Sequence, residues 1–115
     1  MPKDVLFLLP PGFEDKGRRE FCPECAEIWG VLSYFPAIRD ALDIVHVGLE
    51  HPRSEIVALI GEGNHNAPTL VLHPDTQVHP DLDVHEANGL RYLPSARSIA
   101  RHFAHRYGTP VPSGS

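Results

Sequence analysis

Two cysteines stand three residues apart in the segment Cys22-Pro23-Glu24-Cys25, and they are the only cysteines among the 115 residues of the chain. The segment leads directly into a stretch with helical periodicity. A thiolate at a helix N-terminus meets unpaired backbone N–H groups and the positive end of the helix dipole, which lower its pKa from about 8.5 toward neutrality. Cys22 is therefore the candidate nucleophile. Cys25, one turn further on, is placed to attack a mixed disulfide at Cys22 and release the partner.

Other interpretations of the cysteine pair stay open. The two thiols could form half of a zinc site whose other half is His102 and His105, which stand three residues apart near the C-terminus. They could also hold an iron–sulfur cluster shared across a dimer, or be two small buried side chains without reactivity. In the last case the protein would be a binding module.

The elements that position the cysteines follow from the apolar pattern. Residues 4–9 form an apolar run closed by Pro10-Pro11-Gly12, which is typical of a strand buried on both faces of a mostly parallel sheet. Residues 14–20 are predicted to be a polar loop, and the helix after Cys22 is expected to end or kink at Pro36. The other expected elements are a short helix over 38–42, strands over 44–49 and 66–72, a helix that opens at Pro52 and closes at Gly61 and Gly63, an irregular loop or hairpin turn over 73–88, a short edge strand over 90–93 and a final helix from Ser95 to Tyr107.

The predicted order is β-α-β-α-β-(β)-α, which indicates an α/β fold with a mixed central sheet whose last strand pairs antiparallel. We expect one domain over residues 1–108 and a disordered tail over residues 109–115, because the tail has nothing to bury. Within this frame Trp29 either packs in the core or flanks the thiols. His65 and Asn66 either line a substrate groove or are solvated loop residues.

The element order, the Cys-Pro-Glu-Cys segment at 22–25 and Ala67-Pro68-Thr69 at the head of a strand together resemble the thioredoxin superfamily. The resemblance is nearest to its glutaredoxin and glutathione-transferase N-terminal-domain branch. The whole chain also resembles a bacterial family of short thioredoxin-like proteins of unknown function. The likeness covers about residues 4–108 and implies a thioredoxin-like three-layer sandwich.

The resemblance implies a role for each matching position. Pro68 would be cis and pack against the cysteine pair, and the backbone of Ala67 would hydrogen-bond a bound peptide or glutathione. Ser95 and Ala96 would open a helix whose N-terminus holds the γ-glutamyl carboxylate of glutathione, in keeping with the affinity of helix N-termini for anions. The chain departs from the pattern in a longer loop before Cys22 and in a serine at 95 in place of an acidic residue. No all-helical second domain follows, so a complete glutathione transferase is not expected.

Composition limits the remaining functions. The net charge of −5 disfavours sequence-independent binding to nucleic acid, and no apolar run approaches the ~20 residues that span a bilayer. Without a predicted signal peptide, we expect a cytoplasmic protein. The cysteine spacing and the resemblance together favour a thiol–disulfide oxidoreductase, glutaredoxin-like in motif, that acts on a protein disulfide or a glutathione mixed disulfide as a monomer or homodimer. It would need no cofactor or metal, with glutathione as a candidate co-substrate. The alternative is a non-catalytic thioredoxin-fold binding module in which the cysteine pair is structural or holds a metal.

Overall fold

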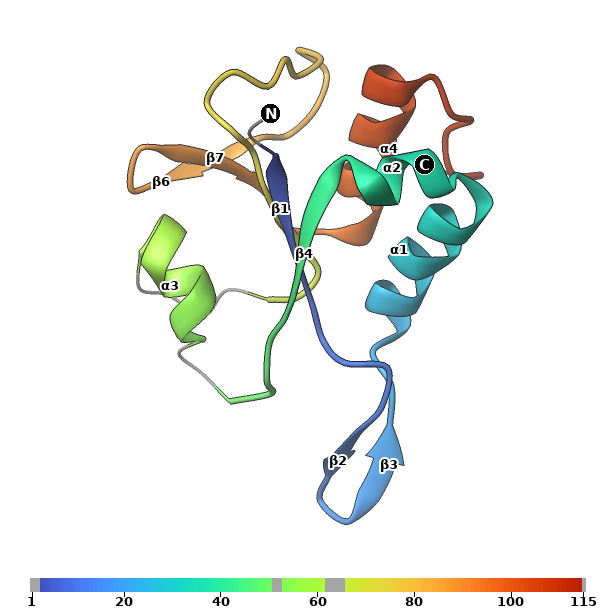
Figure 1. Ribbon diagram of the computed structural model, residues 1–115, viewed down its shortest axis with the longest axis vertical. Helices are drawn as coiled ribbons and strands as arrows, with labels where there is room; N and C mark the ends of the chain where they lie inside the picture. Colours follow the sequence, from blue (N-terminus) through green and yellow to red (C-terminus); the bar gives the residue numbers. More distant parts are fainter. Residues whose placement is uncertain (1–2, 51–52, 62–65, 115) are drawn as a thin grey trace.

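A five-stranded mixed sheet lies at the centre of the molecule, with helices on both of its faces (Figure 1). The computed structural model describes residues 3–50, 53–61 and 66–114. The elements are β1 (Asp4–Leu8), β2 (Phe13–Asp15), β3 (Arg18–Glu20), α1 (Pro23–Tyr34), α2 (Pro36–Asp40), β4 (Leu42–His46), α3 (Ser54–Ile60), β5 (Thr69–Val71), β6 (His85–Ala87), β7 (Leu90–Leu93) and α4 (Ala96–Tyr107).

The strand order is β4-β1-β5-β7-β6. β1 runs parallel to β4 and antiparallel to β5, and β7 runs antiparallel to both β5 and β6. The expectation of a mixed sheet with an antiparallel last strand is therefore confirmed. The expectation of a mostly parallel sheet is wrong, because only one of the four pairings between the described strands of this sheet is parallel. β1 lies inside the sheet, and helices cover both faces of the sheet (Figure 1), which explains its continuous apolar run: Leu6, Phe7 and Leu8 are all buried.

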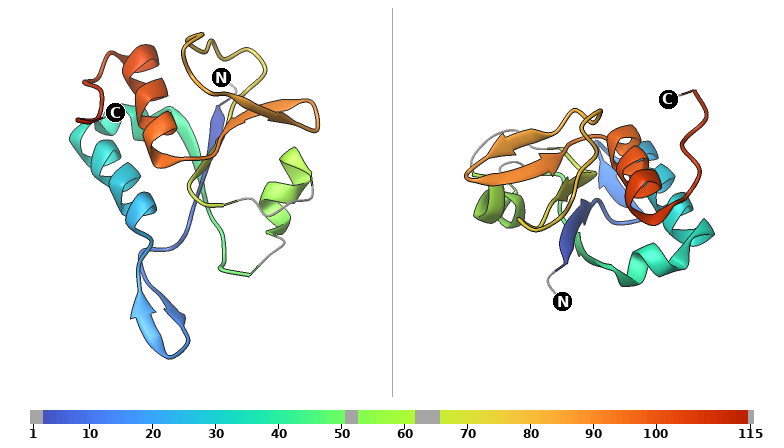
Figure 2. Two further views of the ribbon diagram at one scale, coloured as in Figure 1. Left: turned by 180° about the vertical axis from the view of Figure 1, so that it is seen from behind. Right: turned by 90° about the horizontal axis from the view of Figure 1, so that it is seen from above.

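Helices α1, α2 and α4 lie on one face of the sheet and α3 lies on the other (Figures 1 and 2). The predicted face of α1 is confirmed, since Ile28 and Leu32 are buried while Val31 and Phe35 are partly buried against the core. α4 contributes Ile99 and Phe103. The central layer is thus covered on both sides, and no described helix is long and apolar enough to cross a membrane.

The segment predicted as a polar loop before Cys22 is instead a hairpin of β2 and β3 that projects from the body of the protein (Figure 1). Its turn is formed by Lys16 and Gly17, both with positive φ, of 53° and 79°. Turns of this kind match the twist of antiparallel strands. Because the strand residues are mostly charged, apolar alternation gave no sign of this hairpin.

A second hairpin joins β6 to β7 through Asn88 and Gly89, whose φ angles are 52° and 78°. The predicted strand over 90–93 is confirmed, but it lies inside the sheet, and β6 forms the edge. The loop before β6 is anchored to β1 by the buried carboxylate of Asp4. That carboxylate accepts hydrogen bonds of 2.7 Å from the backbone N–H of His73 and from the hydroxyl of Thr76.

The remaining boundaries differ by a few residues from expectation. The second strand begins at Leu42 rather than residue 44, directly after α2. α3 ends at Gly61, as predicted, whereas Pro52 and Gly63 lie outside the described residues. Gly108 ends α4 with φ of 74°.

Residues 109–114 form neither helix nor strand, and the Ser113 carbonyl accepts a hydrogen bond from Arg97 at 3.2 Å. Disorder of this tail stays a prediction.

Candidate functional site

Cys22 is the N-cap residue of α1, with an extended backbone, and Pro23 is the first helical residue. The backbone N–H of Cys25 donates a hydrogen bond to the Sγ atom of Cys22 at 3.2 Å. The sulfur therefore occupies the position that a serine or aspartate oxygen takes in an ordinary cap. A donor aimed at the sulfur stabilises the negative charge of a thiolate, and the half-buried side chain remains accessible from solvent.

Cys25 lies in a different environment. Its side chain is buried, and its Sγ atom accepts a hydrogen bond from the Leu9 N–H at 3.4 Å. Burial raises the pKa of the Cys25 thiol to about 12, helped by its hydrogen bond with Cys22 and by the charges of Cys22 and Glu24, while the Leu9 N–H acts in the opposite direction. Cys25 is therefore a protonated thiol at neutral pH.

The Ala67–Pro68 peptide bond is cis, as the resemblance implied. Pro68 is buried at the head of β5, and the Cys22 thiol donates to the Ala67 carbonyl with a sulfur–oxygen distance of 3.9 Å. Two segments 45 residues apart in the sequence thus meet at the exposed cysteine. Asn66 is exposed beside them, and its carbonyl accepts a hydrogen bond from the Thr69 hydroxyl. His65 lies outside the described residues.

The N-terminus of α4 lies next to that of α1. Ser95 is its N-cap, and its hydroxyl oxygen accepts a hydrogen bond from the Ser98 N–H at 3.2 Å. The N–H of Ala96 donates to the Glu24 carboxylate at 3.4 Å, and Arg97 pairs with Glu27 at 3.2 Å. The predicted positions 95 and 96 are therefore brought to the cysteine motif, with a carboxylate of the motif itself bound at the helix end.

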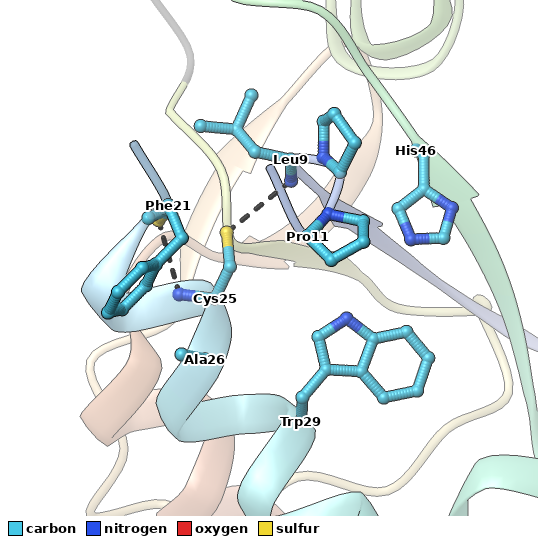
Figure 3. Close-up of a pocket in the computed structure, with 9 residues that line it drawn as sticks. Leu9, Pro11, Phe21, Cys25, Ala26, Trp29 and His46 are labelled. Carbon is cyan, nitrogen blue, oxygen red and sulfur yellow. Dashed lines mark hydrogen bonds between the residues drawn. The ribbon is translucent and has the colours of Figure 1, made fainter. Parts of the chain in front are cut away.

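A cavity of about 430 Å³ opens beside the cysteines, and its lining is almost entirely apolar (Figure 3). Trp29 forms one wall, where its ring stacks on His46 with centroids 6.1 Å apart and planes 16° apart. The guanidinium of Arg39 lies over the Trp29 ring at 5.7 Å. Trp29 thus flanks the site and also contacts the core. The full lining is Leu9, Pro10, Pro11, Phe21, Cys22, Cys25, Ala26, Trp29 and His46.

Arg53 is the cation that sequence reasoning missed. It is 8% exposed and is held by a hydrogen bond of 2.8 Å from its Nε atom to the Gly48 carbonyl. Burial lowers the pKa of Arg53, and attraction to Cys25 and Cys22 partly opposes that shift. Arg53 is therefore a buried cation near the cysteine pair, although burial, and not this charge, governs the pKa of Cys25. An arginine after an apolar strand is too common for sequence to single it out.

The residues proposed as a zinc site do not come together. His102 is buried, and neither of its ring nitrogens is hydrogen-bonded to any described residue, while the exposed His105 ring stacks on His79 with centroids 3.9 Å apart. Across residues 3–50, 53–61 and 66–114, no three histidine, cysteine or acidic side chains converge in a way that could hold a metal.

The chain belongs to DUF3088, a family described as proteins of unknown function, whose pattern matches residues 3–111. No curated protein and no solved structure matches the chain. The family assignment agrees with the single α/β unit seen here.

Proposed function

We propose that this protein is a thiol–disulfide oxidoreductase with a thioredoxin-like fold, in which Cys22 attacks and Cys25 resolves. The observation that carries the proposal is the contrast between two thiols one helical turn apart. Cys22 is half-buried, caps α1 and receives the Cys25 N–H, whereas Cys25 is buried with a pKa raised to about 12. An accessible sulfur that accepts a backbone N–H at a helix N-terminus, beside a buried thiol, is the arrangement that dithiol exchange needs.

Several features support the thioredoxin-like fold. The parallel β1–β4 pair, the antiparallel β5 and β7 beside it, and helices on both faces fit that fold. The cis Pro68 at the head of β5 and its neighbour Ala67 lie against Cys22. In this proposal the backbone of Ala67 pairs with an extended substrate and Pro68 shapes access to the thiol.

The reaction proceeds in two exchanges. The Cys22 thiolate attacks one sulfur of the substrate disulfide, the substrate S–S bond breaks, and the leaving thiolate takes a proton from solvent. Cys25 then loses its proton and attacks the Cys22 sulfur, which releases the second substrate thiol and leaves a Cys22–Cys25 disulfide. Two electrons pass from the dithiol to the substrate, and a thiol reductant returns the protein to its starting state.

The test compares the wild-type protein with Cys22→Ser and Cys25→Ser in the presence of a peptide disulfide, read by intact mass. We expect the wild type to lose two hydrogens reversibly, with the change confined to the peptide that holds both cysteines. Cys25→Ser should accumulate a mixed disulfide at Cys22, and Cys22→Ser should be inert. An active Cys22→Ser variant, or wild-type thiols that resist oxidation, would reject the proposal in favour of a binding module.

A further inference from the structure

The cavity beside Cys22 is suited to an uncharged, apolar group. Two proline rings, an indole and a phenyl ring line it, from Pro10, Pro11, Trp29 and Phe21. Phe21 is 62% exposed although it adjoins the cysteine motif. Figure 3 shows the indole of Trp29 facing Pro11 and His46, with Phe21 on the other side of Cys25. The cavity volume of about 430 Å³ lies within the range of small-ligand sites, which are typically apolar with few polar groups.

The N-terminus of α4, an anion-attracting feature beside the cysteine motif, is already occupied. The first N–H of α4, at Ala96, points to the Glu24 carboxylate, and the next side chain, Arg97, pairs with Glu27. Ser95 satisfies a further N–H of that turn through its own hydroxyl. A substrate carboxylate would have to displace Glu24 and would meet its negative charge on approach. The helix end therefore disfavours an anionic disulfide.

We infer that, if the proposed exchange chemistry is correct, the site selects disulfides whose half-cystine is flanked by an apolar or aromatic side chain, and discriminates against glutathione. The cysteine sulfur of the substrate meets Cys22, and the flanking side chain enters the cavity between Pro11, Phe21 and Trp29. Burial of that side chain supplies the selectivity, because removing apolar surface from water is favourable and does not depend on charge. The exchange itself is unchanged: the dithiol gives two electrons, one disulfide is reduced to two thiols, and the Cys22–Cys25 bond forms.

The test uses three symmetrical disulfides: that of N-acetyl-cysteinyl-phenylalanine amide, that of N-acetyl-cysteinyl-glycine amide, and glutathione disulfide. The reduced protein is mixed with each, and the loss of two hydrogens is followed by mass. Each oxidation rate of the protein is divided by the rate at which dithiothreitol reduces the same disulfide. This ratio corrects for the different intrinsic reactivities of the three disulfides. We expect the phenylalanine compound to react about 10-fold faster than the glycine compound, a ratio equivalent to about 1.4 kcal/mol, and glutathione disulfide to be the slowest.

A second experiment fills the cavity with a larger side chain of the protein itself. Ala26 lies exposed on α1 and lines the cavity, so Ala26→Trp places an indole there without disturbing the core. Ser33→Trp, at an exposed α1 position away from the cavity, is the matched control. Ala26→Trp should lose the preference for phenylalanine, whereas Ser33→Trp should keep both the preference and the wild-type rate with the glycine compound. Thermal unfolding confirms that both variants fold.

The outcomes separate the two claims. Equal normalised rates for phenylalanine and glycine, or glutathione disulfide as the fastest oxidant, would overturn the selectivity while leaving the exchange chemistry intact. A preference that survives in Ala26→Trp would place the recognition elsewhere and also overturn it. If no compound oxidises the wild type, the proposed function fails, and the inference fails with it.

Discussion

His102 offers a direct test of how burial controls stability in this fold. The side chain is 1% exposed on α4, and neither ring nitrogen has a hydrogen-bond partner within the described part of the chain. Burial lowers the pKa of His102 from 6.5 to about 4; the nearby Asp4 carboxylate partly opposes this shift, and the positive charges of Arg106, His105 and Arg91 add to it. Between pH 6.5 and about 4, His102 is therefore neutral in the folded protein and protonated in the unfolded chain.

The sign and size of the effect follow from proton linkage. The unfolded state binds the proton on His102 more tightly than the folded state does. The contribution of this residue to the free energy of unfolding is therefore unchanged above pH 6.5, falls as the pH drops from 6.5 to about 4, and stays at its lowest value below that pH. Each unit of pKa difference is worth about 1.4 kcal/mol, so the loss attributable to this residue is about 3 kcal/mol. That is a large part of the free energy of unfolding of an average domain, which is about 5–15 kcal/mol.

The assay is urea unfolding at several pH values between 7 and 4, for the wild type and for His102→Leu. Leucine removes the titration and two unsatisfied nitrogens, so the variant should be at least as stable as the wild type at pH 7. Between pH 6.5 and 4 the difference between the two proteins should grow by about 3 kcal/mol in favour of the variant. Ser33→Leu, which introduces the same residue at an exposed position of α1, is the control and should keep the pH profile of the wild type. Parallel pH profiles for wild type and His102→Leu would refute the reasoning.

Three further outcomes are expected. At pH 8 iodoacetamide should modify Cys22 and spare Cys25, because a pKa of about 12 leaves about one Cys25 thiol in 10⁴ ionised; equal labelling in a tryptic map would contradict the site geometry. Leu70→Ala, at a fully buried centre of β5, should lower the free energy of unfolding by about 3 kcal/mol, whereas Tyr34→Ala, at an 81% exposed position, should change it by less than about 0.5 kcal/mol. Asp4→Ala should cost about 3 kcal/mol in urea unfolding, because two buried donors lose their carboxylate; a near-neutral result would show that water replaces it.

The sequence was sufficient to predict those elements whose residue pattern reflects burial of side chains or a helix cap. The apolar run of β1 and the periodic face of α1 correspond to buried residues, and Gly108 ends the last helix as predicted. The cis peptide before Pro68 was implied by the resemblance to the thioredoxin superfamily, not by the residue types alone, and is confirmed. The other features depend on local residue types, so a single sequence carries them.

The first hairpin was missed, and β6 of the second was not predicted although a hairpin turn was one interpretation of residues 73–88; both omissions have a physical reason. These strands are short and carry charged or exposed side chains, so they lack the apolar alternation that identifies a strand. The signal lay in the turns, Lys16-Gly17 and Asn88-Gly89, where two successive positive φ angles permit a tight reversal. An Asn-Gly pair favours a two-residue hairpin turn by its residue types alone, so the second hairpin was within reach of the sequence.

The cavity could not have been predicted, because its walls come from the loop after β1, from the first turns of α1 and from the end of β4. Arg53 and His46 likewise reach the site only through tertiary packing. Periodicity places a residue on a face of one element, but it does not tell which faces of different elements meet. The tertiary arrangement was therefore needed to recognise the cavity beside the cysteines.

Glu24, within the cysteine motif, is a second residue whose contacts could not be predicted from periodicity, and it helps to hold α1 in place. From sequence, Glu24 is only a negative charge that opposes ionisation of a neighbouring thiol, and it does contribute to the raised pKa of Cys25. In the fold its carboxylate is bound to the Ala96 N–H, one turn from the Glu27–Arg97 pair. Residues three apart share a helix face, so one side of α1 is fixed to α4 while the side that carries Ala26 and Trp29 borders the cavity. The helix that bears both cysteines is therefore held at its reactive end by its own acidic residues.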